Sequence, residues 1–359
     1  MTEHAAEYEW RGEGDDAEVV LYAPDHSAFE RALHVARLPG VESPGYAVSS
    51  QEGFGWAAAS TTHVAPDLLS IPLRGLLLVA GTRSENPSVP ARELKDRVLR
   101  DLSEASARLP ALNEAGVGRL CESGARAAAE VGLIEEEDLA LLGVLPGDAD
   151  ALGRRALAAG QRDWEGRVDP DLMLVTEVLD SEGAESLGLE MGALAIVVRV
   201  EAGDIGRLAL AVHRERILSR VRSGDFGAAH DLPAAPVESG EAEDLVAAVH
   251  AAANFADARV ARALWILRRV LGDGVGGLDI RAAWRAGGVE KREGRLVHRR
   301  GLASVGNGEA LVSGSYVSAG TGNMWASAPP FGVPEEEGRW PWEEAGLLER
   351  WATLDPTEG

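Results

Sequence analysis

The chain has 359 residues, of which 45% are hydrophobic, and a formal net charge of -23. This length and composition can supply a substantial core for one large domain or two ordinary ones. The negative charge disfavours a general nucleic-acid binder, because phosphate contacts depend on Lys and Arg displacing counterions. Cys121 is the one cysteine, so a disulfide framework and a thiolate zinc cluster are excluded, as is typical of a reducing cytoplasm.

The sequence also argues against export and against a membrane span. Residues Met1–His4 do not form a basic region followed by an apolar core. Moreover, no apolar run reaches the ~18 residues that a spanning helix needs. We therefore expect a soluble cytoplasmic protein that makes no membrane contact.

The predicted secondary structure mixes strands and helices. Short apolar or β-branched runs bounded by Gly, Pro or Asp predict strands, and apolar residues at helical spacing predict helices. In chain order the predictions are strands at Ala17–Tyr22 and Leu73–Ala80, a helix at Ala91–Leu109, strands at Leu172–Val178 and Ala193–Val200, and a helix at Leu245–Leu271 that Gly272 ends. We expect an α+β fold with buried sheets in a single domain over residues 17–354. The acidic segments 1–16 and 355–359 are predicted to be flexible tails.

A basic stretch departs from the overall negative charge. Between Arg259 and Arg300 the chain has ten Arg and one Lys against four acids. Such a stretch can hold phosphate groups. It can equally be the solvated arginine face of a helix followed by a loop.

Four sequence blocks stand out in the chain, and they are SGAR through EEDL at 123–139, LPGDAD at 145–150, AAANFADAR at 251–259 and LVHRRG at 296–301. The last block is similar to the LVHRKG signature of the RtcB RNA ligases, a family that joins RNA ends in tRNA splicing and RNA repair. The other three blocks also resemble segments of that family and keep their order. The resemblance extends from about Leu38 to about Gly322. It implies a compact single-domain fold with helices flanking the sheets around a central cleft.

The resemblance also implies chemistry whose residues are missing here. The family binds two divalent metals, usually Mn²⁺, through Asp, Cys and His ligands, and a C-terminal histidine is guanylated by GTP. The matched ligand positions hold Glu42, Ile71, Arg74, Leu174, Arg199 and Ala282. A guanidinium group repels a metal ion, so Arg74 and Arg199 cannot replace these ligands.

The nucleophile is missing independently of the alignment. His298 is the last histidine and Lys291 the last lysine of the chain, so nothing C-terminal can replace the family's guanylated histidine or its closing lysine. We therefore expect neither GTP nor Mn²⁺ as a cofactor.

Two groups of residues are candidates for ligand binding. The candidates for binding an anion or RNA are Arg199, Arg259, Arg295, His298, Arg299 and Arg300. The family's nucleotide loop corresponds to a Gly-rich segment whose candidates are Ser313, Gly314, Ser315, Ser318 and Gly320. Structural alternatives are tight turns for this loop and, for His298, the end of a buried strand with backbone hydrogen bonds and solvent-facing arginines. Cys121 is expected to be an inert helix residue.

Two functions remain open from the sequence. In the first, the chain is a catalytically degenerate member of the family that binds an RNA end, a nucleotide or a protein partner, with no role in DNA binding. In the second, it is an enzyme with residual or rebuilt RNA ligase chemistry. That chemistry would use Arg199, His298, Arg299 and the acids Glu42 or Glu177, because arginine can stabilise phosphate charge without a metal.

Overall fold

The computed structural model describes most of the central part of the chain. The described residues are 8–13, 18–23, 40–50, 53–80, 100–101, 111–166, 168, 170–178, 188–191, 193–226, 232–271, 278–292, 294–305, 310–313, 327–328 and 352–356. They form a mixed arrangement of helices and mainly antiparallel strands, so the predicted α+β class is confirmed at that level.

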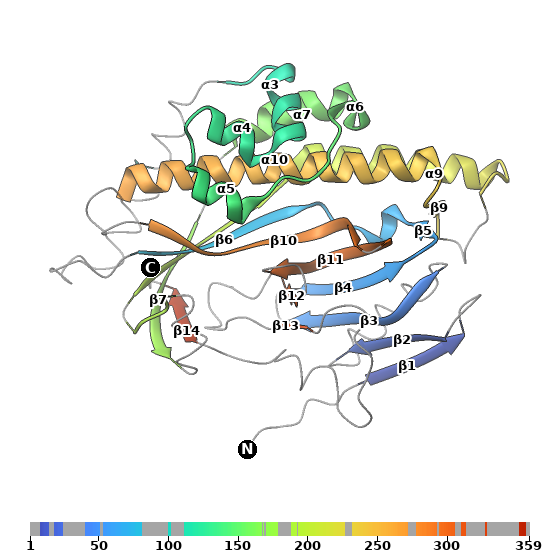
Figure 1. Ribbon diagram of the computed structural model, residues 1–359, viewed down its shortest axis with the longest axis horizontal. Helices are drawn as coiled ribbons and strands as arrows, with labels where there is room; N and C mark the ends of the chain where they lie inside the picture. Colours follow the sequence, from blue (N-terminus) through green and yellow to red (C-terminus); the bar gives the residue numbers. More distant parts are fainter. Residues whose placement is uncertain are drawn as a thin grey trace.

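Within the described residues, one large sheet runs through the molecule (Figure 1). Its strands are β1 (Tyr8–Glu13), β2 (Glu18–Ala23), β3 (Val41–Ser50), β4 (Gly53–Ser60), β6 (Leu73–Ala80), β7 (Asp171–Val178), β8 (Leu194–Glu201), β10 (Leu278–Arg292), β11 (Arg295–Val305), β12 (Ala310–Ser313), β13 (Ser327–Ala328) and β14 (Ala352–Pro356). The order is β1-β2-β3-β4-β11-β10-β6-β8-β7-β14, with β12 and β13 branching from β11. The β2–β3 pair is parallel, and β5 (His63–Val64) and β9 (Ala235–Pro236) form a separate pair.

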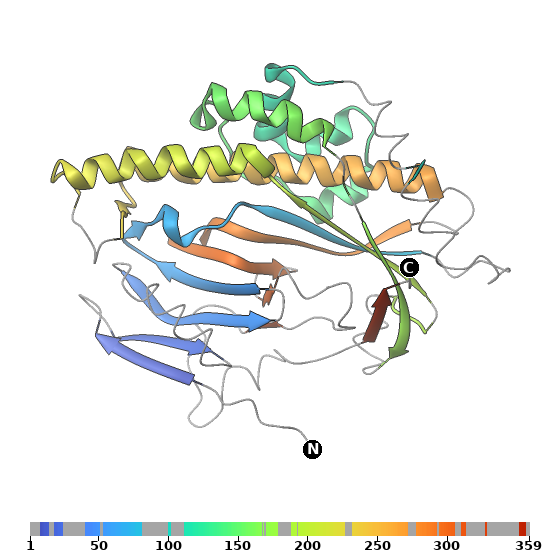
Figure 2. The same ribbon diagram turned by 180° about the vertical axis from the view of Figure 1, so that it is seen from behind.

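The helices cover one face of this sheet. They are α3 (Glu114–Ser123), α4 (Ala125–Glu130), α5 (Glu136–Leu142), α6 (Ala149–Leu152), α7 (Arg154–Glu165), α9 (Gly203–Arg222) and α10 (Gly240–Leu271), with a short 3-10 turn at Pro66–Leu68. Helix α10 lies along the sheet, and α3, α6 and α7 lie on its far side (Figures 1 and 2), whereas α5 contacts β10. No helix of the described part is long and apolar enough to cross a membrane.

The sequence of α10 explains its central position. Its alanines keep high helix propensity while leaving room for neighbours on two sides. Towards the sheet, Val260 and Leu264 pack in one buried cluster with Leu76 and Val198. On the other side, Phe255 and several alanines pack against α3, α6 and α7. The helix is therefore buried along most of its length and can position polar groups inside the molecule.

Most of the predicted elements are confirmed. The strand at Leu73–Ala80 has the predicted bounds, and β2, β7 and β8 each lie within one residue of their predictions. Helix α10 ends at Leu271, directly before Gly272, but begins at Gly240. Of the predicted helix at Ala91–Leu109, residues 100–101 are described and helical, and the rest lies outside the described residues.

The predicted tails are partly wrong. Tyr8–Glu13 form strand β1, which pairs with β2, and Asp355 and Pro356 belong to β14, which pairs with β7. Pairing of β1 uses backbone groups, and Tyr8 and Trp10 are residue types that favour strands. The acidic composition of residues 1–16 obscured this preference.

Candidate anion-binding site

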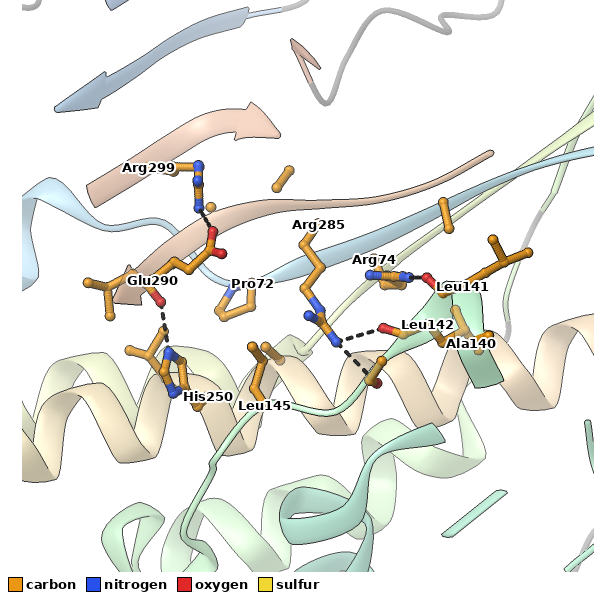
Figure 3. A pocket seen from close by; sticks show the side chains of 18 residues that line it. Pro72, Arg74, Ala140, Leu141, Leu142, Leu145, His250, Arg285, Glu290 and Arg299 are labelled. Carbon is orange, nitrogen blue, oxygen red and sulfur yellow. Dashed lines mark hydrogen bonds and ion pairs between the residues drawn. The ribbon is translucent and has the colours of Figure 1, made fainter. Parts of the chain in front are cut away.

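A cavity of about 360 Å³ lies where α10, the segment after α5 and the strands β6, β10 and β11 meet (Figure 3). Its polar lining comprises Arg74, His250, Arg285, Glu290 and Arg299. Its apolar lining includes Pro72, Leu145, Val249, Ala253 and Ala286. This is the size and mixed character of a pocket for a small ligand.

Two arginines face each other at one end of the cavity. Arg74 on β6 and Arg285 on β10 are direct cross-strand partners, an arrangement that is unfavourable for like charges. Asp257 of α10 is fully buried between them: its Oδ2 accepts a hydrogen bond from Arg285 Nε at 3.2 Å, and its Oδ1 lies 3.5 Å from Arg74 Nε. One carboxylate thus balances two guanidinium groups.

Arg74 keeps its charge in spite of its burial. Burial lowers the pKa of Arg74 to about 10, Asp257 counteracts this shift, and Arg285 adds to it. A group with this pKa is still protonated at neutral pH. The end of the cavity at Arg74 and Arg285 therefore carries one more positive than negative charge.

The same two arginines hold α5 against the sheet. Arg74 Nη2 donates to the carbonyl oxygen of Leu141 and Arg285 Nη2 donates to that of Leu142, both at 2.8 Å. The last carbonyl groups of a helix have no partner within the helix, so cationic side chains stabilise them well. Part of the hydrogen-bonding capacity of the two guanidinium groups is thus used structurally.

The other end of the cavity contains an acid and a histidine. Arg299 Nη1 donates to Glu290 Oε2 at 2.8 Å, and the Glu290 side chain is 33% exposed. His250 Nε2 lies 3.0 Å from the carbonyl oxygen of Val289, and burial lowers the pKa of His250, so its ring is neutral at pH 7. In Figure 3 this group lies apart from Arg74 and Arg285, with Pro72 between them.

A buried asparagine and a glycine fix the segment 143–148 that closes the cavity. Asn254 accepts from the backbone N–H of Leu145 and donates to the carbonyl groups of Leu145 and Cys121, each at 2.9 Å. Gly147 lies directly against α10, where a Cβ atom would come within 2.5 Å of the backbone nitrogen of Ala251. These contacts place the segment between α5 and α10.

His298, a candidate for binding an anion or RNA, has a structural role. It is fully buried within β11; Nδ1–H donates to the carbonyl oxygen of Leu296 at 3.1 Å, and Nε2 accepts from the backbone N–H of Ala65 at 3.3 Å. Burial lowers the pKa of His298 to about 4. The alternative in which His298 bonds to backbone groups describes it correctly, although it lies inside the strand rather than at its end.

The predicted arginines are distributed over separate places. Arg299 is buried and lines the cavity, whereas Arg300 is exposed, with Nη1 3.5 Å from the carbonyl oxygen of Asp67. Arg295 is half-buried in β11. Arg259 of α10 is buried and donates to the carbonyl oxygen of Glu201 at 2.7 Å. Of the six candidates, Arg299 is therefore the one that lines the cavity.

Burial also changes the interpretation of the basic stretch. Arg259 and Arg262 of α10 are both buried, so the interpretation of the basic stretch as a solvent-exposed helix face is wrong for these two residues. The prediction that the arginines beside His298 face solvent is wrong for Arg299, which is buried, and correct for Arg300, which is exposed. The exposed surface here is less basic than the sequence alone indicates.

Two of the positions matched to metal ligands, Arg74 and Arg199, lie on opposite faces of the sheet. Arg199 on β8 pairs with Gly75, the neighbour of Arg74, and successive residues of a strand face opposite sides. Arg74 faces α10, so Arg199 lies on the opposite face and the two cannot reach one ion. Within the part of the chain that the structure describes, no group of three or more His, Cys, Asp or Glu side chains could hold a metal.

The remaining candidates stay predictions. Gly314, Ser315, Ser318 and Gly320 lie outside the described residues, and Ser313 is the last residue of β12. The structure describes the backbone but not the side chains at Glu42 and Glu177, on β3 and β7.

The cavity residues His250, Arg285 and Glu290 were absent from the sequence candidates, and so was Asp257, which is buried between Arg74 and Arg285. Asp257 could have been noticed as the single acid in the predicted helix Leu245–Leu271, since a buried carboxylate needs a cationic partner. No family model matches the chain, and no curated protein matches it.

Proposed function

We propose that this chain is a divergent, catalytically degenerate relative of the RtcB ligases that binds a phosphate-bearing ligand, a nucleotide or an RNA end, in this cavity. The observation that carries the proposal is the pair Arg74 and Arg285, which share one buried carboxylate. An excess buried charge is costly without a partner, and a bound anion would balance it. Guanidinium groups are well suited to phosphate because they donate two parallel hydrogen bonds.

The resembling blocks supply residues at this cavity. LVHRRG contributes Arg299, AAANFADAR contributes Asp257, and Arg74 stands at the position matched to the family's bridging thiolate. A cationic side chain at that position can stabilise phosphate charge where the family would use a metal. An RtcB-like fold in a single domain, a cytoplasmic location and a binding or regulatory role are parts of the same proposal.

The alternative of rebuilt ligase chemistry has less support. Both ring nitrogens of His298 are occupied by backbone groups, and the ring is fully buried. Arg199 lies on the opposite sheet face from the cavity arginine Arg74. These residues would have to reach one substrate for that chemistry, and their positions do not favour it.

Fluorescence anisotropy with short labelled RNAs tests the proposal. An RNA that ends in a 3′-phosphate should bind more tightly than the same RNA with a 3′-hydroxyl, and unlabelled nucleotide should compete. Arg285→Gln should weaken binding of the phosphate-ended RNA by about tenfold or more, the value of a hydrogen bond to a charged group. Arg119→Gln is the matched control, because Arg119 is exposed on α3 outside the cavity.

Arg299→Gln provides a second cavity variant in case Arg285→Gln loosens α5. Circular dichroism and an unfolding curve establish that each variant is folded. Equal affinity for the two RNA ends without competition by nucleotide would contradict the proposal. Equal losses in Arg119→Gln and in the cavity variants would also contradict it.

A further inference from the structure

Two further arginines lie inside the molecule, and neither lines the cavity. Arg259 and Arg262 are about one turn apart on α10, so they share one face of this helix. That face meets Trp164 in the last turn of α7 and the following Gly166. The exposed fractions are 9% for Arg259, 3% for Arg262 and 5% for Trp164. These four residues form a buried place that we call the α7–α10 junction.

Several buried N–H groups at the α7–α10 junction have no acceptor in the part of the chain that the structure describes. They are Nε of Arg259, Nε and Nη1 of Arg262, and Nε1 of Trp164. Arg259 uses Nη1 for the carbonyl oxygen of Glu201, and Arg262 stacks on Trp164 with Cζ 5.2 Å from the centre of the ring. Because buried donors normally have an acceptor, this group of donors at one place indicates a site for an acceptor that the chain itself does not supply.

The two arginines also carry charges that no carboxylate contacts. Burial lowers the pKa of Arg262 to about 10, Arg259 adds to this shift, and Glu165 counteracts it. Burial likewise lowers the pKa of Arg259, which Asp163 and Glu201 counteract. A guanidinium group with a pKa of about 10 is protonated at neutral pH. Among the described residues, none of the three acids forms a hydrogen bond or an ion pair with either arginine through its carboxylate: Asp163 accepts from a backbone N–H, and Glu165 and Glu201 are exposed.

The chemistry of the junction favours a small anion over water. Water would accept hydrogen bonds from the donors, but it would not offset two like charges that are buried side by side. An anion does both, and guanidinium groups pair well with anions because they are weakly hydrated. The space is narrow, since a Cβ atom on Gly166 would lie 3.0 Å from the carbonyl oxygen of Asp163 and 3.4 Å from Nη2 of Arg259. A halide ion suits such a place better than a phosphate ester.

We propose that the α7–α10 junction binds one small monovalent inorganic anion, such as chloride, between Arg259 and Arg262 and beside the indole N–H of Trp164. The ion links the end of α7 to α10 and thereby stabilises the helical layer. This inference is independent of the proposed function, because the junction and the cavity share no lining residue.

Thermal unfolding in different sodium salts at constant ionic strength tests this inference. Replacing gluconate, which is too large for the junction, by chloride or bromide should raise the unfolding midpoint of the wild type by about 2–4 °C in a saturable manner. Arg262→Gln should reduce this rise to less than about 1 °C, because it removes one of the two charges that hold the ion. Arg269→Gln is the matched control, since Arg269 also stacks on a tryptophan, Trp265, but is exposed on the same helix. It should keep the full rise.

A crystal structure of the wild-type protein grown with sodium bromide locates the ion directly. Data measured at the bromine absorption edge should show an anomalous peak within hydrogen-bonding distance of Arg259 and Arg262. Density without a bromine signal at the α7–α10 junction would identify ordered water and overturn the proposal. A rise in midpoint that increases without saturation, or that Arg262→Gln retains, would also overturn it. The anomalous data and the salt series on the wild type decide the question even if Arg262→Gln does not fold.

Discussion

Replacing Asp257 by Asn tests the charge arrangement at the cavity directly. The Asp257 side chain is fully buried, 3.5 Å from Arg74 Nε and 2.5 Å from Arg285 Nη2. Asparagine keeps the shape but removes the negative charge, so two cross-strand guanidinium groups would face each other without a counter-charge. Breaking a buried ion pair from one side costs about 3–5 kcal/mol. Because the Arg285 side chain is 26% exposed and partly screened by solvent, we expect a loss of roughly 3 kcal/mol.

Urea denaturation followed by circular dichroism at pH 7 measures this loss. Glu243→Gln, an exposed change of the same charge on the same helix, should alter the free energy of unfolding by less than about 0.5 kcal/mol. Adding Arg285→Gln to Asp257→Asn should remove the repulsion, so the double variant should be about 1 kcal/mol more stable than the two single effects predict. A loss below about 1 kcal/mol for Asp257→Asn, or strict additivity in the cycle, would refute this account of the cavity.

Three further predictions concern stability and reactivity. The pKa of His298 is lowered from 6.5 to about 4, so its contribution to stability is complete above pH 6.5 and is lost as the pH falls through 4. Unfolding curves between pH 7 and pH 3.5 should show that the free energy of unfolding falls by up to roughly 3 kcal/mol through His298, and His298→Gln should abolish this part of the loss. The assignment would be contradicted if His298→Gln lost as much stability over this pH range as the wild type does. Gly75→Ala should cost about 1–3 kcal/mol, because its Cβ would overlap the indole ring of Trp284, whereas Gly240→Ala meets open space and should cost less than about 0.5 kcal/mol; equal effects on thermal unfolding would refute this. Burial raises the pKa of the Cys121 thiol, so a thiol reagent should label it only as the chain unfolds, and rapid labelling of the folded protein would show that it is accessible.

The sequence predicts best those elements whose apolar pattern indicates that they are buried. Apart from Arg74, the segment Leu73–Ala80 is apolar on both faces and lies in the middle of the sheet, so its pattern and its environment agree. The predicted start of α10 was late because Gly240–Asp244 contains acids instead of an apolar stripe. Acids at the first turn of a helix are favourable through the helix dipole, but this preference gives a weaker signal than periodicity.

The sequence predicts no strand at β10 and predicts β11 only as the alternative in which a buried strand ends at His298, because the patterns of both strands are irregular. β10 contains Arg281 and Arg285 among alanines, and its pairing with β11 shifts between Ala286 and Gly288. Gly287 and Gly288 both have positive φ angles, which interrupt the alternation that a sequence pattern relies on. The arginines therefore suggested a helix face and a loop rather than a strand pair.

The cavity could be predicted only in part for a related reason. The resemblance points to Arg299 and Arg74, but the charged residues that surround them are brought close by long-range pairing. Arg285 becomes the partner of Arg74 through the register of β6 and β10, and Asp257 meets both through the packing of α10 on the sheet. Neither relation is expressed in the local spacing of residues.

The retained charge at Arg74 and Arg285 argues for a ligand rather than for stability alone. One arginine could hold the carbonyl end of α5, and replacing buried ionic groups by apolar ones is often neutral or stabilising. The chain instead places two guanidinium groups opposite each other and supplies a single carboxylate. Departures of this kind from local rules concentrate at functional sites, where the binding of a ligand offsets their cost. An anion that completes the charge balance is the simplest reason for this arrangement.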